Sequence, residues 1–246
     1  MSTGPFILAI VQARMNSGRL PGKVMLPLLG RTIVGTHVHR LAHSRHITKI
    51  MVATTGSAAD DDLAADLEQQ GIAVFRGSEN DVLDRFARCA AQYDADIVIR
   101  TTADCPLVDP AYVDRLIEFF SMAEGHPKHG SISLQRIPRG FDAEIITAPA
   151  LQEAARLASD PYEREHVTPY LYRNAPAGSS IQYFPDLEGG DLRLCIDEPR
   201  DYEAICALEA RFGDKLADAG LDDIVAFLRS HPDIAAINAD VKQRPS

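Results

Sequence analysis

Apolar segments alternate with amphipathic ones along the first half of the chain. Short runs rich in β-branched residues come first, and each is followed by a segment whose apolar positions recur at helical spacing. Strands that alternate with helices of roughly 10 to 15 residues are typical of βαβ units and a parallel sheet. We expect strands at 6–11, 49–55, 72–75 and 96–100, and helices at 32–42, 60–70, 80–93 and 109–120.

The alternation is interrupted after residue 122. Residues 123–130, which read AEGHPKHG, predict a linker or a hinge. Beyond it, strands at 131–135 and 141–147 are expected to pair around a turn at 137–140. We then expect helices at 151–158 and 162–173, strands at 181–184 and 192–196, helices at 199–212 and 221–230, and a tail to 246 that is loose or packs as an extra segment. The whole pattern predicts one α/β domain with a mostly parallel sheet and helices on both faces.

A cationic loop follows the first expected strand. Arg14, Arg19 and Lys23 lie in it together with Gly18 and Gly22. The carboxyl ends of parallel strands are where open α/β sheets bind ligands, and guanidinium groups match phosphate oxygens. These residues are therefore expected to cradle a polyphosphate, although a Gly- and Pro-containing turn with three solvated cations would have the same composition.

Two common phosphate motifs are excluded by inspection. A P-loop needs four residues between its glycines and a Ser or Thr after its Lys. Only three residues separate Gly18 from Gly22, and Val24 follows Lys23. The G-x-G-x-x-G fingerprint of dinucleotide-binding enzymes is absent as well.

Charge is distributed unevenly along the 246 residues. The net charge of −10 argues against a nucleic-acid partner, which would require a cationic surface. The first 59 residues contain seven Lys or Arg and no Asp or Glu, whereas the remainder contains 18 against 35. This asymmetry fits a first part that receives a polyanion and a later part that supplies carboxylates to metal ions, or simply an acidic solvated surface.

Neither a signal-like apolar stretch nor a long apolar run is present, so we expect a cytoplasmic protein without a membrane partner. The four cysteines have no C-x-x-C spacing and are expected to be reduced thiols. Cys105 is expected to be a packing residue.

Two aspartates at strand ends are candidates for metal ligands. Asp104 follows the strand at 96–100, and Asp197 follows the strand at 192–196. Mg²⁺ prefers carboxylate oxygens and keeps water or phosphates in its other positions. A turn aspartate at 104 and a helix cap at 197 are the alternative explanations.

Four histidines lie on or just after the helix at 32–42: His37, His39, His43 and His46. His39 and His43 have the i, i+4 spacing of metal ligands, but no Glu or Cys joins them in the sequence. We therefore interpret these histidines as helix surface.

The segment 12–23, which reads QARMNSGRLPGK, resembles the opening motif of the cytidylyltransferases that make CMP-activated acidic sugars, the CMP-Kdo and CMP-sialate synthetases. It is most similar to the SpsF-type branch, which is named for spore-coat polysaccharide biosynthesis. Further similar motifs occur in the expected order at 75–85, 102–110, 138–144, 164–170 and 196–201.

This resemblance implies a Rossmann-like nucleotide-diphospho-sugar transferase fold in which the hairpin after residue 130 forms a small β arm. Residues 1–122 would form the nucleotide-binding half, 123–212 the sugar-binding and dimerisation half, and 213–246 a C-terminal helix and tail. The implied enzyme is a magnesium-dependent homodimer that transfers CMP from CTP to an acidic or related sugar and releases pyrophosphate, for surface polysaccharide or glycoconjugate biosynthesis.

The resemblance also implies a role for individual residues. Arg14, Lys23 and Asp104 would be catalytic, and Asp104 and Asp197 would hold Mg²⁺. The nucleotide would contact Ala13, Arg14, Ser17, Gly18, Arg19, Lys23, Arg76, Ser78 and Asp104. The sugar would contact Asp81, Arg139, Asp142, Glu144, Arg164 and His166, for which ion pairs on helix or hairpin surfaces are the alternative explanation.

Three alternatives keep the expected fold. The first is a nucleotide-sugar-dependent glycosyltransferase, for which Asp94-Ala95-Asp96 is the obvious D-x-D motif, although it precedes its strand. The second is a nucleotidyltransferase that uses another triphosphate, and the third is a non-catalytic nucleotide-binding module. Relatives often carry Ser or Thr where this chain has Gly18, so a hydroxyl contact to the nucleotide is missing or replaced by a backbone NH.

Overall fold

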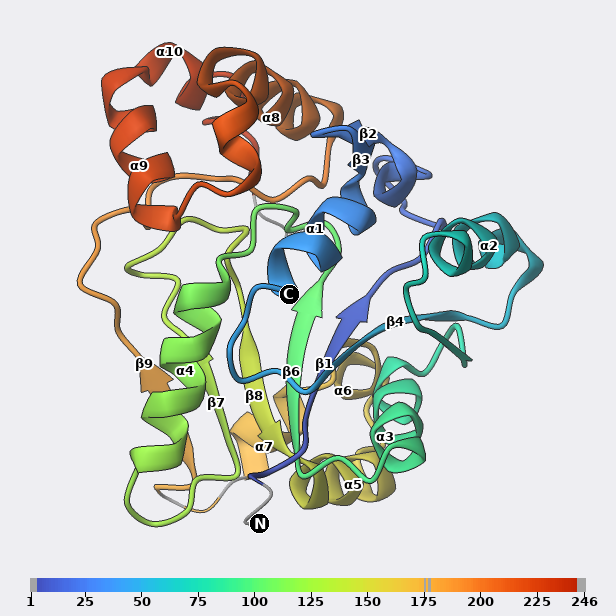
Figure 1. Ribbon diagram of the computed structural model, residues 1–246. Coiled ribbons are helices and arrows are strands. Elements are labelled where there is room, and N and C mark those ends of the chain that lie inside the picture. Colours follow the sequence, from blue (N-terminus) through green and yellow to red (C-terminus); the bar gives the residue numbers. More distant parts are fainter. Residues whose placement is uncertain (1–3, 175, 177, 243–246) are drawn as a thin grey trace.

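A seven-stranded, mostly parallel sheet forms the centre of the computed structural model, which describes residues 4–174, 176 and 178–242 (Figure 1). The strand order is β5-β4-β1-β6-β8-β7-β9, and only β8 runs antiparallel to the others. The strands are β1 (Ile7–Gln12), β4 (Lys49–Thr55), β5 (Val74–Gly77), β6 (Ile97–Thr102), β7 (His129–Ile132), β8 (Glu144–Thr147) and β9 (Ser180–Tyr183). The expected fold class is confirmed.

Helices cover both faces of this sheet, as expected. Side chains of α1 (Ile33–Leu41), α4 (Pro110–Met122), α8 (Pro199–Phe212) and α9 (Leu221–Ser230) share one hydrophobic core with the strands. Those of α3 (Val82–Gln92) and α5 (Ala148–Leu157) share a second core. The remaining elements are α2 (Asp61–Gln69), α6 (Pro161–His166), α7 (Pro169–Asn174), α10 (Pro232–Ala235), the 3-10 turns η1 (Lys23–Met25), η2 (Ala58–Asp60) and η3 (Asp214–Ala217), and a short hairpin of β2 (Pro27–Leu28) and β3 (Arg31–Thr32).

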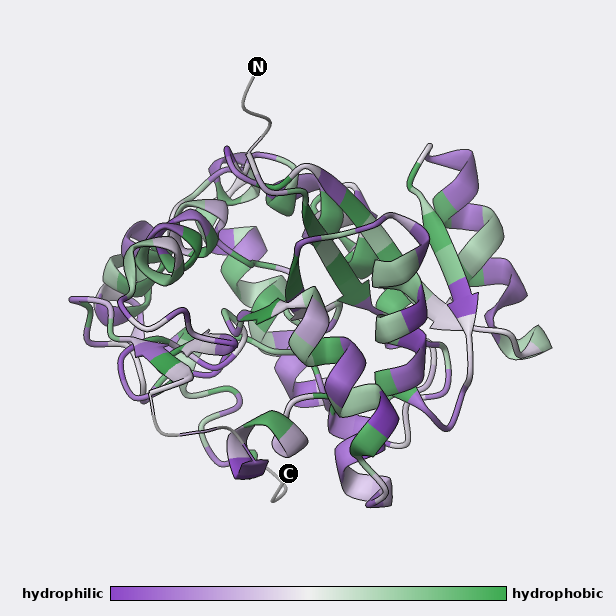
Figure 2. Cartoon of the chain, turned by 90° about the horizontal axis from the view of Figure 1, so that it is seen from below, coloured by the Kyte–Doolittle hydropathy of each residue, from purple (hydrophilic) through white to green (hydrophobic). Residues whose placement is uncertain are grey.

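The side-chain alternation of β1 separates the two cores. Ile7, Ala9 and Val11 belong to the first core, whereas Leu8 and Ile10 belong to the second. All five side chains are buried because β1 lies in the middle of the sheet between β4 and β6. Figure 2 shows the strands as an apolar interior, with polar residues on the outer helix surfaces.

Helix starts follow the sequence closely. The Thr32 side chain accepts a hydrogen bond from the NH of Gly35 and caps α1. Asp109 caps α4 in the same way, with Pro110 at the first helical position. Both caps lie where the sequence predicts them.

β1 lies between two parallel strands, which creates a switch point at the carboxyl edge of the sheet. β4 pairs with β1 on one side and β6 pairs with it on the other, so the loops after β1 and β6 lie next to each other. Gln12 lies opposite Thr102, and the NH of Ala103 donates to the carbonyl of Gln12 over 2.9 Å. Ligands of open α/β sheets bind at such a switch point. In Figure 1 the arrowheads of β1 and β6 point toward this edge, above which lie α8, α9 and α10.

The expected β arm is part of the central sheet. β7 and β8 pair as antiparallel strands, as predicted, but β8 also pairs with β6, and β7 with β9. The hairpin therefore extends the main sheet and is not a separate arm.

The single helix expected at 162–173 is wrong, because two helices occupy this segment. α6 ends at His166 and α7 begins at Pro169. Proline lacks an NH and disfavours helical backbone in the residue before it. Val167, between the helices, has a φ of 72°, which turns the chain sharply beside His166.

The strand expected at 192–196 is also wrong. The segment makes only one isolated bridge among the described residues, between Arg193 and Arg139. Pro138 has no NH, and Gly140 has a φ of 113°, so the neighbouring segment cannot continue a ladder. The two segments are nevertheless tightly packed, since a Cβ on Gly140 would lie 2.4 Å from the carbonyl carbon of Leu194.

Much of the tail packs as an extra segment, one of the two expected possibilities. Asn238 is buried, and its side-chain amide donates to the carbonyl of Arg193 and to Asp201. Residues 243–246 lie outside the described part. In the residues that the structure describes, no helix is both long and apolar enough to cross a membrane.

Candidate active site

The cationic loop after β1 is folded back on itself. The NH groups of Ser17 and Gly22 both donate to the carbonyl of Met15 over 2.9 Å, and Gly22 has a φ of 71° that favours glycine. The NH of Met15 donates to Asp60 over 2.7 Å, which ties the loop to the start of α2. This folding directs Lys23, at the start of η1, into the protein, where it is buried.

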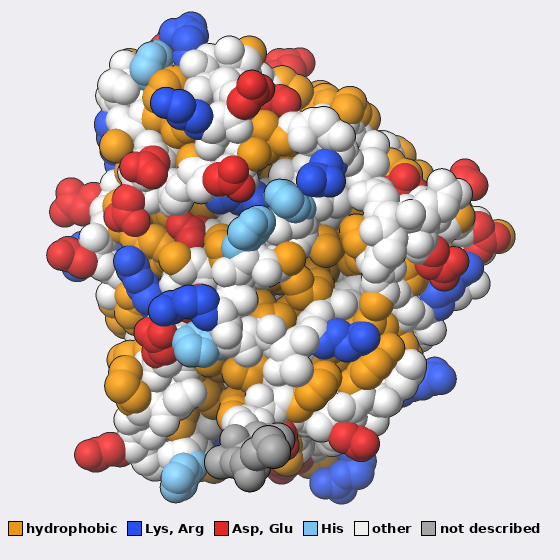
Figure 3. Space-filling model, in the orientation of Figure 1, with side chains coloured by type: hydrophobic (Ala, Val, Ile, Leu, Met, Phe, Trp, Pro, Cys, Tyr) orange, Lys and Arg blue, Asp and Glu red, His pale blue; other side chains and the backbone are white. Residues whose placement is uncertain are grey.

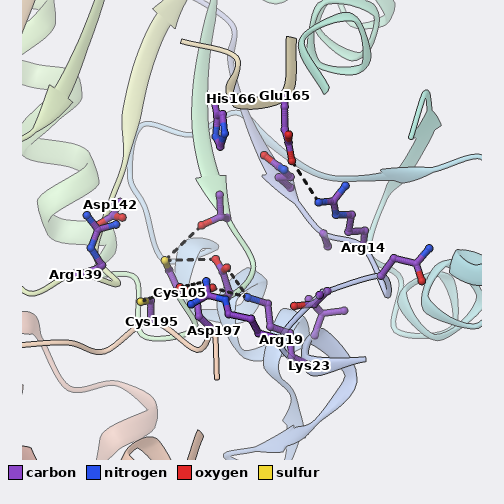
Figure 4. A pocket seen from close by; sticks show the side chains of 18 of the residues that line it. Arg14, Arg19, Lys23, Cys105, Arg139, Asp142, Glu165, His166, Cys195 and Asp197 are labelled. Carbon is purple, nitrogen blue, oxygen red and sulfur yellow. Dashed lines mark hydrogen bonds and ion pairs between the residues drawn. The ribbon is translucent and has the colours of Figure 1, made fainter. Parts of the chain in front are cut away.

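Lys23 joins the two candidate metal ligands. Its Nζ lies 2.8 Å from Oδ2 of Asp104 and 3.0 Å from Oδ1 of Asp197. It also donates to the carbonyl of Ile196 over 2.7 Å. Figure 4 shows Lys23 and Arg19 extending toward Asp197 at the base of the pocket. Two carboxylates from distant loops therefore converge on one cation.

Further cations and carboxylates surround Asp197. Arg19 and Arg193 each lie 3.0 Å from its Oδ2. The NH groups of Asp197 and Glu198 both donate to the buried Asp201, which holds the backbone at the start of α8. Glu198 is the N-cap of α8, so the expected alternative of Asp197 as the helix cap is wrong.

These contacts set the charge states at the base of the pocket. Burial opposes ionisation of Asp197, but the charges of Lys23, Arg19 and Arg193 outweigh it and lower its pKa to about 2. Burial likewise opposes the charge on Lys23, yet the two carboxylates raise its pKa above the usual value. Both side chains are therefore ionised at neutral pH.

A cavity of about 510 Å³ opens above this cluster. Most of the residues expected to contact the nucleotide or the metal line this cavity, together with some of those expected to contact the sugar. Its lining includes Ala13, Arg14, Ser17, Gly18, Arg19, Lys23, Asp104, Arg139, Asp142, His166 and Asp197.

A second cavity, of about 760 Å³, lies beside the first over β7 and β8. The expected sugar residues Arg139, Asp142, Glu144 and His166 line it, and all of these except Glu144 line the first cavity too. The two cavities therefore share a wall.

Arg139 and Asp142 occupy this shared wall because of the packing around Gly140. The NH of Arg139 donates to the carbonyl of Leu192, and the carbonyl of Arg139 accepts from the NH of Leu194. Figure 4 shows Arg139 and Asp142 together across the pocket from Arg14. Burial raises the pKa of Asp142 to about 6, and the charge of Arg139 only partly offsets it.

Four expected site residues do not line either cavity: Arg76, Ser78, Asp81 and Arg164. Arg76 donates to the carbonyls of Thr55 and Ser57, and the carbonyl of Ser78 accepts from Arg85. Asp81 caps α3 and pairs with Arg164, whose Nε lies 2.7 Å from Oδ2 of Asp81. In this structure these four residues make contacts within the protein.

Sequence reasoning missed several lining residues, chiefly Gln12, Asn16, Arg100, Thr102, Glu165 and Cys195. Arg100 pairs with Glu144 and lines both cavities. The sequence offered one sign that Arg100 could line the pocket, because Arg100 ends an expected strand that lies opposite the cationic loop. Glu165 lies 3.6 Å from Arg14 across the mouth of the pocket, a contact between segments that no local pattern reveals (Figure 4).

His37 supports the loop that carries Asp104, so its expected place on the helix surface is wrong. The ring is fully buried, and its nitrogens lie 2.8 Å from the carbonyl of Cys105 and 2.9 Å from Oγ1 of Thr101. Burial lowers the pKa of His37 to about 4, so the ring is neutral. Cys105 is itself buried, as expected of a packing residue, and burial raises the pKa of its thiol.

The D-x-D sequence lies at the other end of the sheet. Asp94 and Asp96 precede β6, and Asp96 accepts a hydrogen bond from the NH of Phe6 over 2.7 Å. Both residues are therefore remote from the pocket at the carboxyl ends of β1 and β6, which removes the sequence support for a glycosyltransferase metal motif.

Comparison with known families agrees with the site. The model of the cytidylyltransferase family matches residues 8–218, which include both strand-end loops and Asp197. The chain belongs to this family. As a cytidylyltransferase it is a nucleotidyltransferase enzyme, as the sequence predicted.

Individual relatives support the same assignment. The spore coat polysaccharide biosynthesis protein SpsF of Bacillus subtilis is 37% identical over 240 residues, which cover 93% of this chain and 96% of SpsF. A cytidylyltransferase structure from Leptospira borgpetersenii is 31% identical, with a TM-score of 0.88 over 99% of this chain and 100% of that one. The 3-deoxy-manno-octulosonate cytidylyltransferase of Trichlorobacter lovleyi is 33% identical over 46% of this chain and 44% of its own length. The predicted similarity to SpsF and to CMP-Kdo synthetases is confirmed.

Proposed function

We propose that this cytidylyltransferase transfers CMP from CTP to a hydroxyl of an acidic or related sugar, with Mg²⁺ bound at Asp104 and Asp197, and releases pyrophosphate. The observation that carries the proposal is the convergence of these two carboxylates on a single cation, Lys23, at the base of a cavity closed by a cationic loop. Phosphoryl-type transfer needs positioning and charge stabilisation more than covalent catalysis.

The loop after β1 would hold the triphosphate. Arg14, Arg19 and Lys23 line the cavity, as do Ala13, Ser17 and Gly18. Guanidinium groups bind phosphate oxygens bidentately, and a lysine ammonium acts as a point charge. Arg14 is paired only with Glu165 at the exposed mouth among the contacts described, so it can turn toward an incoming phosphate at little cost.

The donor set of the two aspartates suits Mg²⁺. Asp104 and Asp197 offer hard carboxylate oxygens that already lie around one cation, and the cavity leaves space for water and phosphate oxygens. A bound Mg²⁺ would stabilise charge on the α-phosphate and lower the pKa of the attacking hydroxyl. Lys23 would then leave the carboxylates and be free to bind the departing pyrophosphate.

The second cavity would receive the sugar. Arg100, Arg139 and Arg173 supply positive charge for a carboxylate, and Glu144 and Gln182 supply acceptors and a donor for hydroxyl groups. Because Arg139, Asp142 and His166 line both cavities, a sugar hydroxyl there can reach a phosphate in the first. An in-line attack on the α-phosphorus would form the phosphodiester bond while pyrophosphate leaves.

The relatives support a biological setting for the proposed reaction. SpsF is named for spore coat polysaccharide biosynthesis, and we place this enzyme in surface polysaccharide or glycoconjugate biosynthesis as a cytoplasmic homodimer. Its partners would then be CTP, the sugar and a second copy of the chain.

A pyrophosphate-release assay tests the proposal. The protein is incubated with CTP and Mg²⁺ and a panel of acidic and neutral sugars, and CMP-sugar formation is followed by mass spectrometry. We expect release that depends on both CTP and one class of sugar, and that is absent without Mg²⁺. Release with another triphosphate would change the base assignment, and consumption of a nucleotide sugar without any triphosphate activity would support the glycosyltransferase alternative.

A further inference from the structure

Three potential metal-binding side chains meet on the surface away from the carboxylate pair at Asp104 and Asp197. They are His39 in the last turn of α1, His43 just after this helix, and Asp218 just after η3. One ligand atom from each lies within 4.8 Å of those of the other two. Figure 3 shows two histidine side chains side by side on the face over α1, with acidic side chains near them. No local pattern joins Asp218 to this pair, since it lies 175 positions after His43 in the chain.

Buried contacts fix Asp218 in this position. The guanidinium group of Arg40 is buried and donates to the carbonyls of Leu216, Ala217 and Ala219 over 2.7 to 3.0 Å. It also donates to the carbonyl of Val108 over 3.0 Å. Because Arg40 follows His39 directly and its acceptors flank Asp218, these buried hydrogen bonds hold together the two backbone segments that carry the three ligand candidates.

The tautomer of His43 is also suited to a metal. Its Nδ1 lies 3.0 Å from the carbonyl of His39, and a carbonyl can only accept, so Nδ1 carries the proton. In the neutral ring, Nε2 of His43 then carries the lone pair. Metal-binding histidines commonly donate their second ring NH to a carbonyl in this way, which fixes the orientation of the ring. The two rings lie edge to face, with centroids 5.1 Å apart.

We propose that His39, His43 and Asp218 bind a divalent transition-metal ion of the Zn²⁺ class, with water completing the coordination. Two imidazoles and one carboxylate at i, i+4 and a distant position are a common zinc donor set. Metal–ligand bonds of about 2.0 to 2.2 Å require closely spaced ligand atoms, and side-chain rotations at an exposed position can adjust the spacing of these three. Mg²⁺ prefers oxygen ligands, so this site differs chemically from the Asp104 and Asp197 pair.

Some charges around this site favour a bound cation, and others oppose it. The Asp218 carboxylate and the carboxyl-terminal end of α1 favour a cation here, whereas the positive charge of Arg31 acts against one at His39. An occupied site would bridge α1 and the segment before α9, and so tie the nucleotide-binding half to the C-terminal helices. The proposal is independent of the function proposed above.

Zinc titration of the whole protein tests this site. The protein is freed of metal with a chelator and titrated with Zn²⁺ by calorimetry, and with Co²⁺ by visible absorption. We expect one high-affinity site that weakens roughly tenfold or more in His39→Gln and His43→Gln, and also weakens in Asp218→Asn. Wild-type Zn²⁺ affinity in both histidine variants, or no binding by the wild type, would overturn the proposal.

Two controls make the outcome specific. His126→Asn removes another exposed histidine, at a residue with a φ of 52° that asparagine tolerates, and should leave the titration unchanged. Asp104→Asn weakens the other metal pair and should retain the high-affinity Zn²⁺ site. Loss of this site in Asp104→Asn, with no loss in the histidine variants, would assign the zinc to the active-site carboxylates and contradict the proposal. Far-UV circular dichroism confirms that each variant is folded.

Discussion

The ammonium nitrogen of Lys23 lies 2.8 Å from Oδ2 of Asp104, although the two residues are 81 positions apart in the chain. The contact lies at the base of the first cavity, and the same ammonium also reaches Asp197. Lys23 therefore neutralises the carboxylate pair in the free protein. Because Mg²⁺ and Lys23 would bind the same carboxylate oxygens of Asp104 and Asp197, the competition between them can be measured.

Replacing Lys23 should make the protein less stable and more responsive to Mg²⁺. Lys23→Met leaves Asp104 and Asp197 without the cation between them, and the loss of one partner of a buried ion pair costs about 3 kcal/mol. Urea unfolding without nucleotide should show this loss, and Mg²⁺ should restore more stability to the variant than to the wild type. Lys128→Met, which removes an exposed pair with Glu153, is the matched control and should change stability by less than about 1 kcal/mol. An equal Mg²⁺ response in Lys23→Met and wild type would contradict the competition.

Asp104→Asn should abolish turnover and leave the fold intact. The amide keeps the shape of the side chain but binds Mg²⁺ weakly, so kcat should fall by roughly a thousandfold or more. The unfolding midpoint should change little, since Asp197 and Ile196 continue to accept from Lys23. Asp62→Asn on the exposed face of α2 should retain full activity. Activity of Asp104→Asn close to that of the wild type would show that Asp104 does not hold the catalytic metal.

Gly18→Ser should strengthen nucleotide binding. A Cβ at Gly18 meets no atom within 4 Å, and the loop lines the first cavity, so a hydroxyl can be added there without a clash. One new hydrogen bond contributes about 1 kcal/mol, which is roughly a fivefold lower Kd for the triphosphate. Gly18→Ala adds the carbon without the hydroxyl and should bind like the wild type. Equal affinities of the Ser and Ala variants would place the triphosphate away from residue 18.

Asp142→Asn should remove a pH dependence of stability. Burial raises the pKa of Asp142 from an ordinary value near 4 to about 6, so the native state holds this proton more tightly than the unfolded state does. The stabilisation that the protonated Asp142 gives the native state is fully present below pH 4 and is lost as the pH rises through 6. The variant should therefore gain stability relative to the wild type between these pH values, by about 2 to 3 kcal/mol for a shift of about two units. Urea unfolding at pH 4.5 and 7.5 measures the difference, and a difference that does not vary with pH would exclude a raised pKa at Asp142.

Local patterns predicted most of the fold. Thr32 and Asp109 cap their helices, and β4 spans Lys49–Thr55 as expected, because caps and apolar periodicity act within a few residues. The two failures have different causes. The break in the helix expected at 162–173 lies just before Pro169, a local signal, whereas a distant contact decides the backbone at 192–196. Residues 192–196 are extended and apolar, yet Pro138 and Gly140 beside them prevent a ladder.

The site was predictable to a similar degree. The cationic loop and Asp104 follow strands that are adjacent in a parallel sheet, so their proximity follows from the topology. Nothing local showed that Lys23 would lie between two carboxylates, or that Arg164 would pair with Asp81 away from the cavities. Arg100 and Glu165 were missed because their importance comes from the segments they face. His37 shows the same limit, since only the packed structure brings its ring to the loop that carries Asp104.

The most direct test of the central claim needs no knowledge of the sugar. Thermal unfolding is measured with CTP, UTP, ATP, GTP or dTTP, each with and without Mg²⁺. A ligand at 100 times its Kd adds about 2.7 kcal/mol, which should raise the midpoint by roughly 5 to 10 °C in a chain of this size. We predict a shift with CTP that requires Mg²⁺ and is reduced in Asp104→Asn. No shift with any triphosphate would contradict the account.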